Sequence, residues 1–128
     1  MKSETKAWVK KAEEDLNLAL YAFKSREHFY NSVCFHAQQS CEKYLKGVLQ
    51  EKGRDIPKTH DMRMLVEAVS EFIPDISVYK NRLVSLTAYA VAARYPFEDA
   101  EKKDAEKALE ISEICRKIVR KNMGYRKD

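Results

Sequence analysis

Two residues with the chemistry to act on a phosphodiester lie close together in the chain: Arg54 and His60, in the run Arg-Asp-Ile-Pro-Lys-Thr-His. An imidazole can move a proton near neutral pH, and a guanidinium can stabilise the negative charge that develops on phosphate oxygens. The pair therefore predicts a candidate site with His60 as general acid or base and Arg54 as electrostatic stabiliser. A structural interpretation stays open beside it, because His60 lies where a helix is expected to begin and could pack there or help to cap the turn.

Three further polar side chains fall on helix faces that are otherwise apolar. Successive helical residues rotate by about 100°, which puts Asp15 in the middle of one apolar face and Gln38 at the edge of another. Arg94 shares its face with Leu83. An inward charge is costly unless it is paired or linked to solvent. Two interpretations follow: a structural bridge from Asp15 to an arginine or amide, or a cleft in which Arg94 binds a phosphate through its planar fork.

A second polar stripe runs along the opposite side of the second expected helix. It consists of His36, Gln39, Lys43 and Lys46, with Phe35 and Glu42 on its flank. One interpretation is a solvated face. The other is a dimer or partner surface, because an aromatic ring among charges does not suit plain solvent. In either case the lysines are candidate auxiliary charges for a phosphate.

Five amphipathic helices are expected to position these side chains. The chain has only 3 Gly and 3 Pro among its 128 residues, which favours a few long helices joined by short loops. The helices are predicted at about Lys6–Lys24, Phe29–Lys52, Asp61–Phe72, Ser77–Arg94 and Asp99–Met123. Each carries its apolar residues on one face, so the sequence predicts an all-α fold in which the helices form an antiparallel bundle around one core.

Composition sets further expectations. Hydrophobic residues make up 45% of the chain and charged residues 34%, which is typical of one globular domain over residues 1–128, with a core at about 6–123 and a short basic C-terminal tail. No segment has the roughly 20 apolar residues of a membrane span, and the N-terminus has no apolar signal core, so the protein is expected to be cytoplasmic.

Cys34, Cys41 and Cys115 are expected to be buried thiols. Their spacing does not support zinc, and no cofactor is expected.

The net charge of +4 is concentrated toward the C-terminus. The basic residues there are Arg116, Lys117, Arg120, Lys121, Arg126 and Lys127. Part of this excess offsets the dipole of the last helix, and the remainder permits a polyanionic partner.

Four stretches of the sequence form a specific ordered set from about Trp8 to Val119. They are Trp8 with Ala12-Glu13-Glu14-Asp15-Leu16 and Ala19; Phe35-His36-Ala37-Gln38-Gln39-Ser40-Cys41-Glu42-Lys43-Tyr44-Leu45-Lys46; Thr59-His60-Asp61; and Arg94-Tyr95-Pro96 before an alanine-rich last helix. Together they resemble the HEPN domain, a nucleotide-binding domain of prokaryotes and higher eukaryotes. The resemblance implies an up-and-down bundle of four or five helices that forms a homodimer. Stand-alone members are similar to partners of minimal nucleotidyltransferases, often in toxin–antitoxin pairs.

Many HEPN members are metal-independent endoribonucleases with an Arg-x(4–6)-His motif late in the chain and an active site formed across the dimer. Here Arg94-Tyr95-Pro96 stands in that region and no histidine follows it, while Arg54 and His60 satisfy the spacing only in the loop before the third helix. The pattern therefore resembles the non-catalytic branch, for which nucleotide binding and complex formation are the proposed roles. The ligand-binding residues predicted on this basis are Arg94, Asp15, Gln38, Lys43, Lys46 and Tyr95. An endoribonuclease using Arg54 and His60 stays open as the alternative.

Overall fold

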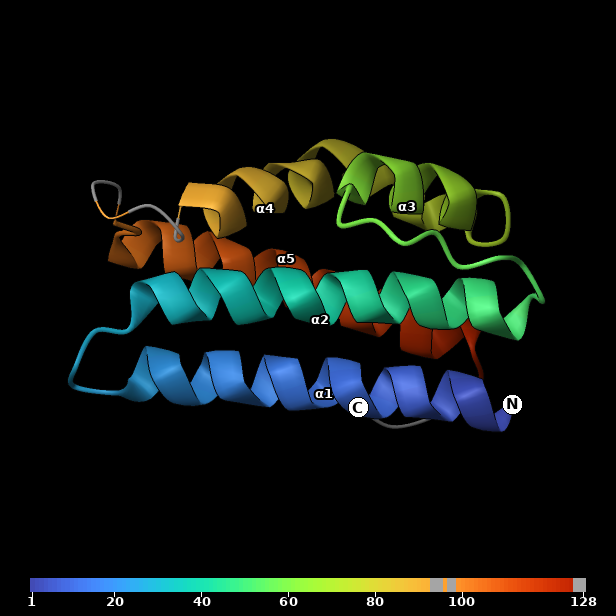
Figure 1. Ribbon diagram of the computed structural model, residues 1–128, viewed down its shortest axis with the longest axis horizontal. Helices are drawn as coiled ribbons and strands as arrows, with labels where there is room; N and C mark the ends of the chain where they lie inside the picture. The colour runs from blue at the N-terminus through green and yellow to red at the C-terminus, as the bar shows by residue number, and fades with distance from the viewer. Residues whose placement is uncertain (93–95, 97–98, 126–128) are drawn as a thin grey trace.

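Six helical elements make up the computed structural model, which describes residues 1–92, 96 and 99–125. They are α1 (Ser3–Lys24), α2 (Tyr30–Glu51), α3 (Met62–Ser70), the short 3-10 helix η1 (Pro74–Tyr79), α4 (Lys80–Ala92) and α5 (Lys102–Asn122). The described residues contain no β-strand. The predicted all-α fold is thereby confirmed, and the long helices α1, α2, α4 and α5 run alternately up and down (Figure 1).

Helix α2 occupies the centre of the bundle. It contacts α1, α3, α4 and α5, and Figure 1 shows it between α1 on one side and α3 and α4 on the other. Between Ser40 and Leu49, every residue of α2 except Lys43 is buried. A helix that is enclosed on nearly all sides cannot leave its polar side chains in bulk water, so those side chains need internal partners.

The sequence predicted the helices well and their ends less well. The predicted fourth helix, from about Ser77, is instead 3-10 up to Tyr79, because Pro74 at the start of this segment begins a tight turn that continues directly into α4. The last helix begins at Lys102 rather than Asp99. Glu101 and Asp104 form a reciprocal capping box there, while Asp99 accepts a hydrogen bond from the Asn31 side chain at 3.0 Å.

Helices α1 and α2 pack closely where Gly47 faces Trp8. A Cβ atom added at Gly47 would lie 3.3 Å from the Trp8 Cβ, which is tighter than ordinary van der Waals contact. The absence of a side chain at this position therefore lets the two helices approach and brings the polar residues of α1 within reach of those on α2.

The three cysteines are buried, as the sequence predicts. Cys34, Cys41 and Cys115 are buried free thiols. Burial raises the pKa of the Cys34 thiol to about 11, so it stays protonated and unreactive near neutral pH. Among the helices described, none is both long and apolar enough to cross a membrane.

Candidate functional site

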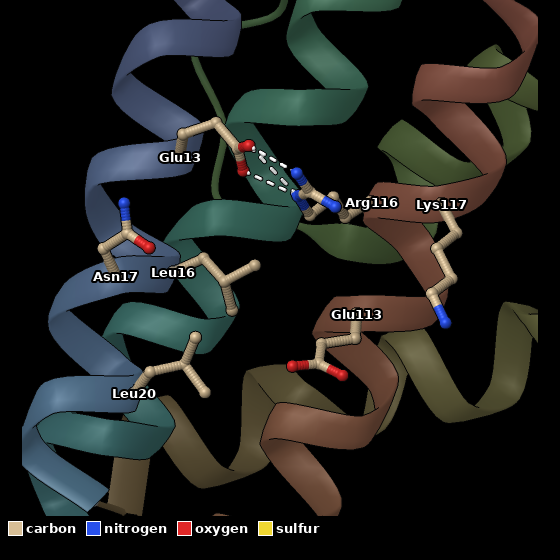
Figure 2. A pocket seen from close by; sticks show the side chains of 7 residues that line it. All are labelled: Glu13, Leu16, Asn17, Leu20, Glu113, Arg116 and Lys117. Carbon is tan, nitrogen blue, oxygen red and sulfur yellow. Dashed lines mark hydrogen bonds and ion pairs between the residues drawn. The ribbon is translucent and has the colours of Figure 1, made fainter. Parts of the chain in front are cut away.

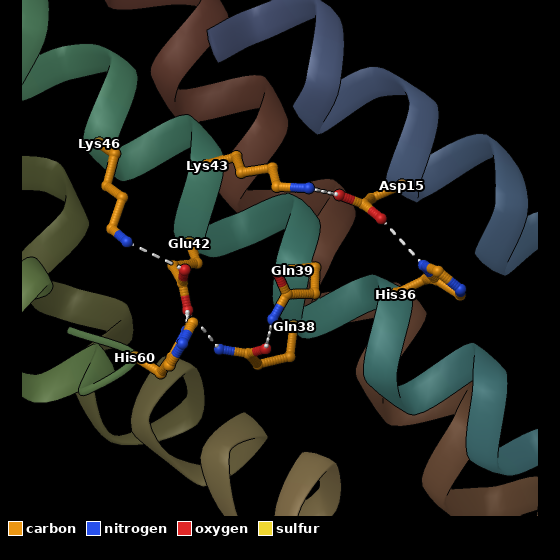
Figure 3. Close-up of polar contacts among 8 residues, drawn as sticks. All are labelled: Asp15, His36, Gln38, Gln39, Glu42, Lys43, Lys46 and His60. Atoms are coloured by element: carbon orange, nitrogen blue, oxygen red, sulfur yellow. Dashed lines mark hydrogen bonds and ion pairs between the residues drawn. The ribbon is translucent and has the colours of Figure 1, made fainter. Parts of the chain in front are cut away.

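The carboxylate of Asp15 points from α1 to α2. Asp15 is only 7% exposed, as the helical wheel predicts. Its Oδ1 atom lies 2.9 Å from His36 Nδ1, and its Oδ2 atom lies 2.5 Å from Lys43 Nζ (Figure 3). The expected bridge from Asp15 to an arginine or amide is not what the described residues form, because a histidine and a lysine of α2 take that place.

Glu42 is the second buried carboxylate of this region, with 3% exposure. Its Oε1 atom accepts a hydrogen bond from Gln38 Nε2 at 3.1 Å and lies 2.9 Å from His60 Nδ1. Its Oε2 atom lies 3.1 Å from Lys46 Nζ, and Gln39 donates to Gln38 Oε1 at 3.0 Å. Glu42 therefore joins α2 to the loop that precedes α3 (Figure 3).

The two carboxylates are arranged alike, and each holds one lysine and one histidine. We call the whole set the α2 polar cluster: Asp15, His36, Gln38, Gln39, Glu42, Lys43, Lys46 and His60. A carboxylate oxygen only accepts hydrogen bonds, so in each pair the proton lies on the Nδ1 atom of the imidazole. The Nε2 atom of each ring is then the one left for another partner. The His60 side chain is 71% exposed, so its ring is accessible from solvent.

Of the two interpretations of the stripe along His36, Gln39, Lys43 and Lys46, a solvated face fits the observed exposure only in part. Lys46 is buried, and the other three are half-buried. The physical reason is the central position of α2, since α1 covers one flank of the stripe and the loop before α3 approaches the other. His36, Lys43 and Lys46 are therefore held in place by internal contacts rather than moving freely in water.

Arg54 and His60 do not converge on a shared partner. Arg54 Nη2 lies 2.7 Å from Glu71 Oε1, and the guanidinium lies 5.1 Å from the centre of the Phe72 ring. His60 faces Glu42 instead. A cavity of about 380 Å³ is lined by Arg54 and not by His60. Within this monomer, the two residues whose spacing suggested a nuclease pair therefore contact different carboxylates, Arg54 that of Glu71 and His60 that of Glu42.

Arg94 and Tyr95 lie outside the described residues. The other four residues of the predicted ligand-binding set, which are Asp15, Gln38, Lys43 and Lys46, all belong to the α2 polar cluster. Sequence reasoning placed Lys43 and Lys46 as auxiliary charges, but it did not identify Glu42 as a shared acceptor or connect His60 to it.

Sequence reasoning also missed a cluster between α1 and α5, which we call the Glu13 cluster: Glu13, Arg116 and Arg120. Arg116 donates to both carboxylate oxygens of Glu13, from Nε at 2.9 Å and from Nη2 at 2.9 Å (Figure 2). Arg120 Nη1 lies 3.4 Å from Glu13 Oε1. Burial alone would raise the pKa of Glu13, but hydrogen bonding and charge from Arg116 outweigh it and lower that pKa. Two arginines that looked like part of a basic C-terminus are therefore partners of a carboxylate.

Comparisons with known proteins agree with this architecture. The sequence model of the HEPN domain family matches residues 5–122. Among solved structures, the crystal structure of TT1696 from Thermus thermophilus superposes with a TM-score of 0.82, covers 94% of this chain and 99% of that chain, and is 22% identical. At that identity the likeness concerns the fold alone. No curated protein sequence matches the chain.

Proposed function

The chain belongs to the HEPN domain family, and we propose that it is a nucleotide- or RNA-binding module whose phosphate site includes the α2 polar cluster. The observation that carries the proposal is that two buried carboxylates each hold a lysine and a histidine on one side of α2. Cations positioned in this way lose little conformational freedom when a phosphate arrives, which favours binding. The carboxylates then serve as positioning groups for the cations that meet the ligand.

Arg94 and Tyr95 are part of the proposal although they lie outside the described residues. The resemblance of Arg94-Tyr95-Pro96 to the family pattern supports Arg94 as a phosphate contact. A guanidinium keeps its charge at all physiological pH values and binds two phosphate oxygens at once. Asp15 and Gln38 would orient the site from α1 and α2, and Lys43 and Lys46 would add positive charge.

The proposal includes protein partners: a second copy of this chain, and a minimal nucleotidyltransferase in a toxin–antitoxin-like pair. An apolar surface beside the α1–α2 turn supports a protein contact, because Tyr21 is 80% exposed and Leu18 and Phe29 are each about half exposed. A cavity of about 230 Å³ lies among these residues. We expect this surface to be the dimer contact.

Light scattering tests the dimer. Tyr21→Glu is expected to weaken self-association by about thirty-fold, because a charge would replace a central aromatic anchor. Val78→Glu is the matched control, since Val78 is a similarly exposed apolar residue on η1. A wild-type protein that is monomeric at high concentration would contradict the dimer, and a dimer that tolerates Tyr21→Glu would move the contact to another face.

A second candidate function is metal-independent RNA cleavage with His60 as general acid or base and Arg54 as stabiliser. The observation in its favour is that Glu42 orients His60 through Nδ1 while most of the ring stays exposed. A carboxylate-held imidazole is a common arrangement for proton transfer. Against it stands the pairing of Arg54 with Glu71.

Incubation of the purified protein with labelled RNA, with divalent metals chelated, distinguishes the two functions. Our proposal predicts intact RNA for the wild type. Cleavage that is abolished by His60→Ala would replace the binding module by the nuclease. Cleavage that survives His60→Ala and is lost in Arg94→Ala would instead point to an active site that includes Arg94. Circular dichroism of each variant shows whether it is folded.

A further inference from the structure

A groove of about 650 Å³ lies next to the α2 polar cluster, between the first half of α1 and α2. Its walls are Glu4, Ala7, Trp8, Lys11, Lys43 and Gln50. The four residues from α1 are spaced at i, i+3, i+4 and i+7, so they share one face of that helix. Lys43 belongs both to this groove and to the α2 polar cluster, which makes the two features continuous.

Trp8 is held in a fixed orientation in this groove. Its Nε1 atom donates a hydrogen bond to Gln50 Oε1 at 3.3 Å, and Lys46 Nζ lies 5.9 Å from the ring centre. On the α2 side, Gly47 leaves room for the Trp8 Cβ atom to approach. The ring is nevertheless only half-buried. It therefore presents a pre-oriented aromatic surface to the groove.

The charges around Trp8 favour an anion. Lys11 is exposed and has no ion-pair partner among the residues that the structure describes. Lys43 faces Asp15, and the acid on the groove wall, Glu4, accepts a hydrogen bond from the Ser3 hydroxyl. Two lysines and one glutamate line the groove, and because Lys43 is already paired with Asp15, Lys11 is the lining cation that an anion meets first.

We propose that this groove binds a nucleoside phosphate, with its base against the Trp8 ring and its phosphates toward Lys11 and Lys43. The proposal rests on the nucleotide-binding function above. It adds a place for the base of a nucleotide whose phosphates meet the lysines. Every nucleobase has a π face that stacks on an aromatic ring, and the adjacent lysines supply the charge that a phosphate needs. The Gln50 side chain accepts from Trp8 through its oxygen, and no described residue accepts a hydrogen bond from its amide nitrogen, which can therefore donate to an edge of the base.

The experiment uses Trp8 itself, because it is the only tryptophan of the chain and its fluorescence reports on the groove directly. The full-length protein is titrated with ATP, with adenosine and with tripolyphosphate, and binding is measured in parallel by calorimetry. We expect ATP to bind and quench Trp8. Adenosine should quench but bind more weakly, whereas tripolyphosphate should bind with little quenching.

Matched variants separate the base contact from the phosphate contact. Trp8→Leu should weaken ATP binding about ten-fold by calorimetry, while Trp8→Phe, which keeps an aromatic face, should retain most of the affinity. Lys11→Met should weaken the binding of ATP and the binding of tripolyphosphate by similar factors. Lys10→Met is the control, because Lys10 carries the same charge one residue away and does not line the groove.

The outcomes also distinguish this inference from the proposed function. One outcome would overturn the proposed groove site and leave nucleotide binding elsewhere on the protein. In that outcome, ATP binds without changing Trp8 fluorescence and binds equally well to Trp8→Leu and Lys11→Met. Quenching by tripolyphosphate as strong as that by ATP would overturn base stacking. If neither ATP nor an adenosine hexaribonucleotide bound, both proposals would fail.

Discussion

Two clusters of charged side chains join the helices of this bundle, and they are built from different cations. In the Glu13 cluster, a carboxylate of α1 is held by two arginines of α5, and Arg116 contacts both of its oxygens. In the α2 polar cluster, the carboxylates are held by lysines and histidines. Arginine makes rigid bidentate pairs, whereas lysine and histidine present single nitrogens that can exchange partners.

The difference in cations also separates the roles of the clusters. The Glu13 cluster has its polar atoms turned toward each other and ties α1 to α5 (Figure 2). Glu13 and Arg116 also line a cavity of about 330 Å³, together with Glu113 and Lys117, whose opposite charges cancel. The α2 polar cluster reaches solvent through His60 and continues into the Trp8 groove through Lys43. We therefore propose that the first cluster stabilises the fold and that the second binds a ligand.

The largest effect on stability is expected from Glu13→Gln. This change removes the charge that compensates Arg116 and Arg120, and it should lower the free energy of unfolding by about 2–3 kcal/mol. Urea denaturation measures the loss. The double variant Glu13→Leu/Arg116→Leu should recover part of the stability, because it removes one of the two arginine charges that the Glu13 carboxylate compensates. A loss below about 0.5 kcal/mol for Glu13→Gln would contradict the structural role.

Glu42→Gln should have a smaller effect on folding, of about 1–2 kcal/mol. The amide keeps an oxygen that can accept hydrogen bonds from Gln38 and His60, but it no longer compensates the charge of Lys46. The same denaturation experiment compares this variant with Glu13→Gln. If Glu42→Gln were the more destabilising of the two, the α2 polar cluster would be the main electrostatic support of the fold and the assignment of roles would be reversed.

The pH dependence of the free energy of unfolding should reflect the protonation of Glu13. Its pKa in the folded protein lies below the ordinary value of 4.5, so the unfolded chain binds the proton more readily. The stabilisation from Glu13 is therefore present above that value and is lost as the pH falls through the folded pKa. Unfolding of the wild type and of Glu13→Gln, compared between about pH 6 and about pH 3, should show the difference shrinking with acidification. A constant difference would contradict this linkage.

His60→Ala should hardly affect stability, with a loss below about 0.5 kcal/mol, because most of this side chain is solvent-exposed. Its effect should appear in ligand affinity instead. Thermal denaturation and RNA binding of the same preparation provide the two readings. A marked loss of stability with unchanged binding would make His60 a structural residue.

The sequence predicted the fold and the inward position of Asp15, because both depend on helical periodicity, which is local. It did not predict the partners of Asp15, since His36 and Lys43 are 21 and 28 residues away on another helix. The Glu13–Arg116 pair is separated by 103 residues. Such contacts depend on how the helices pack. The partial burial of the polar stripe on α2 was not predicted for the same reason, because whether a polar stripe is exposed depends on which neighbouring elements cover it.

The central claim is that phosphate binding belongs to the α2 polar cluster and not to the Glu13 cluster. The most direct test is the salt dependence of RNA affinity for the wild type, Lys43→Met and Lys117→Met, measured by fluorescence anisotropy. We predict that Lys43→Met weakens binding and reduces the slope of log affinity against log salt by about 1, as expected for one lost phosphate contact. Lys117→Met, which removes an equal charge beside the Glu13 cluster, should match the wild type. Unchanged RNA binding in Lys43→Met together with weaker binding in Lys117→Met would contradict the claim.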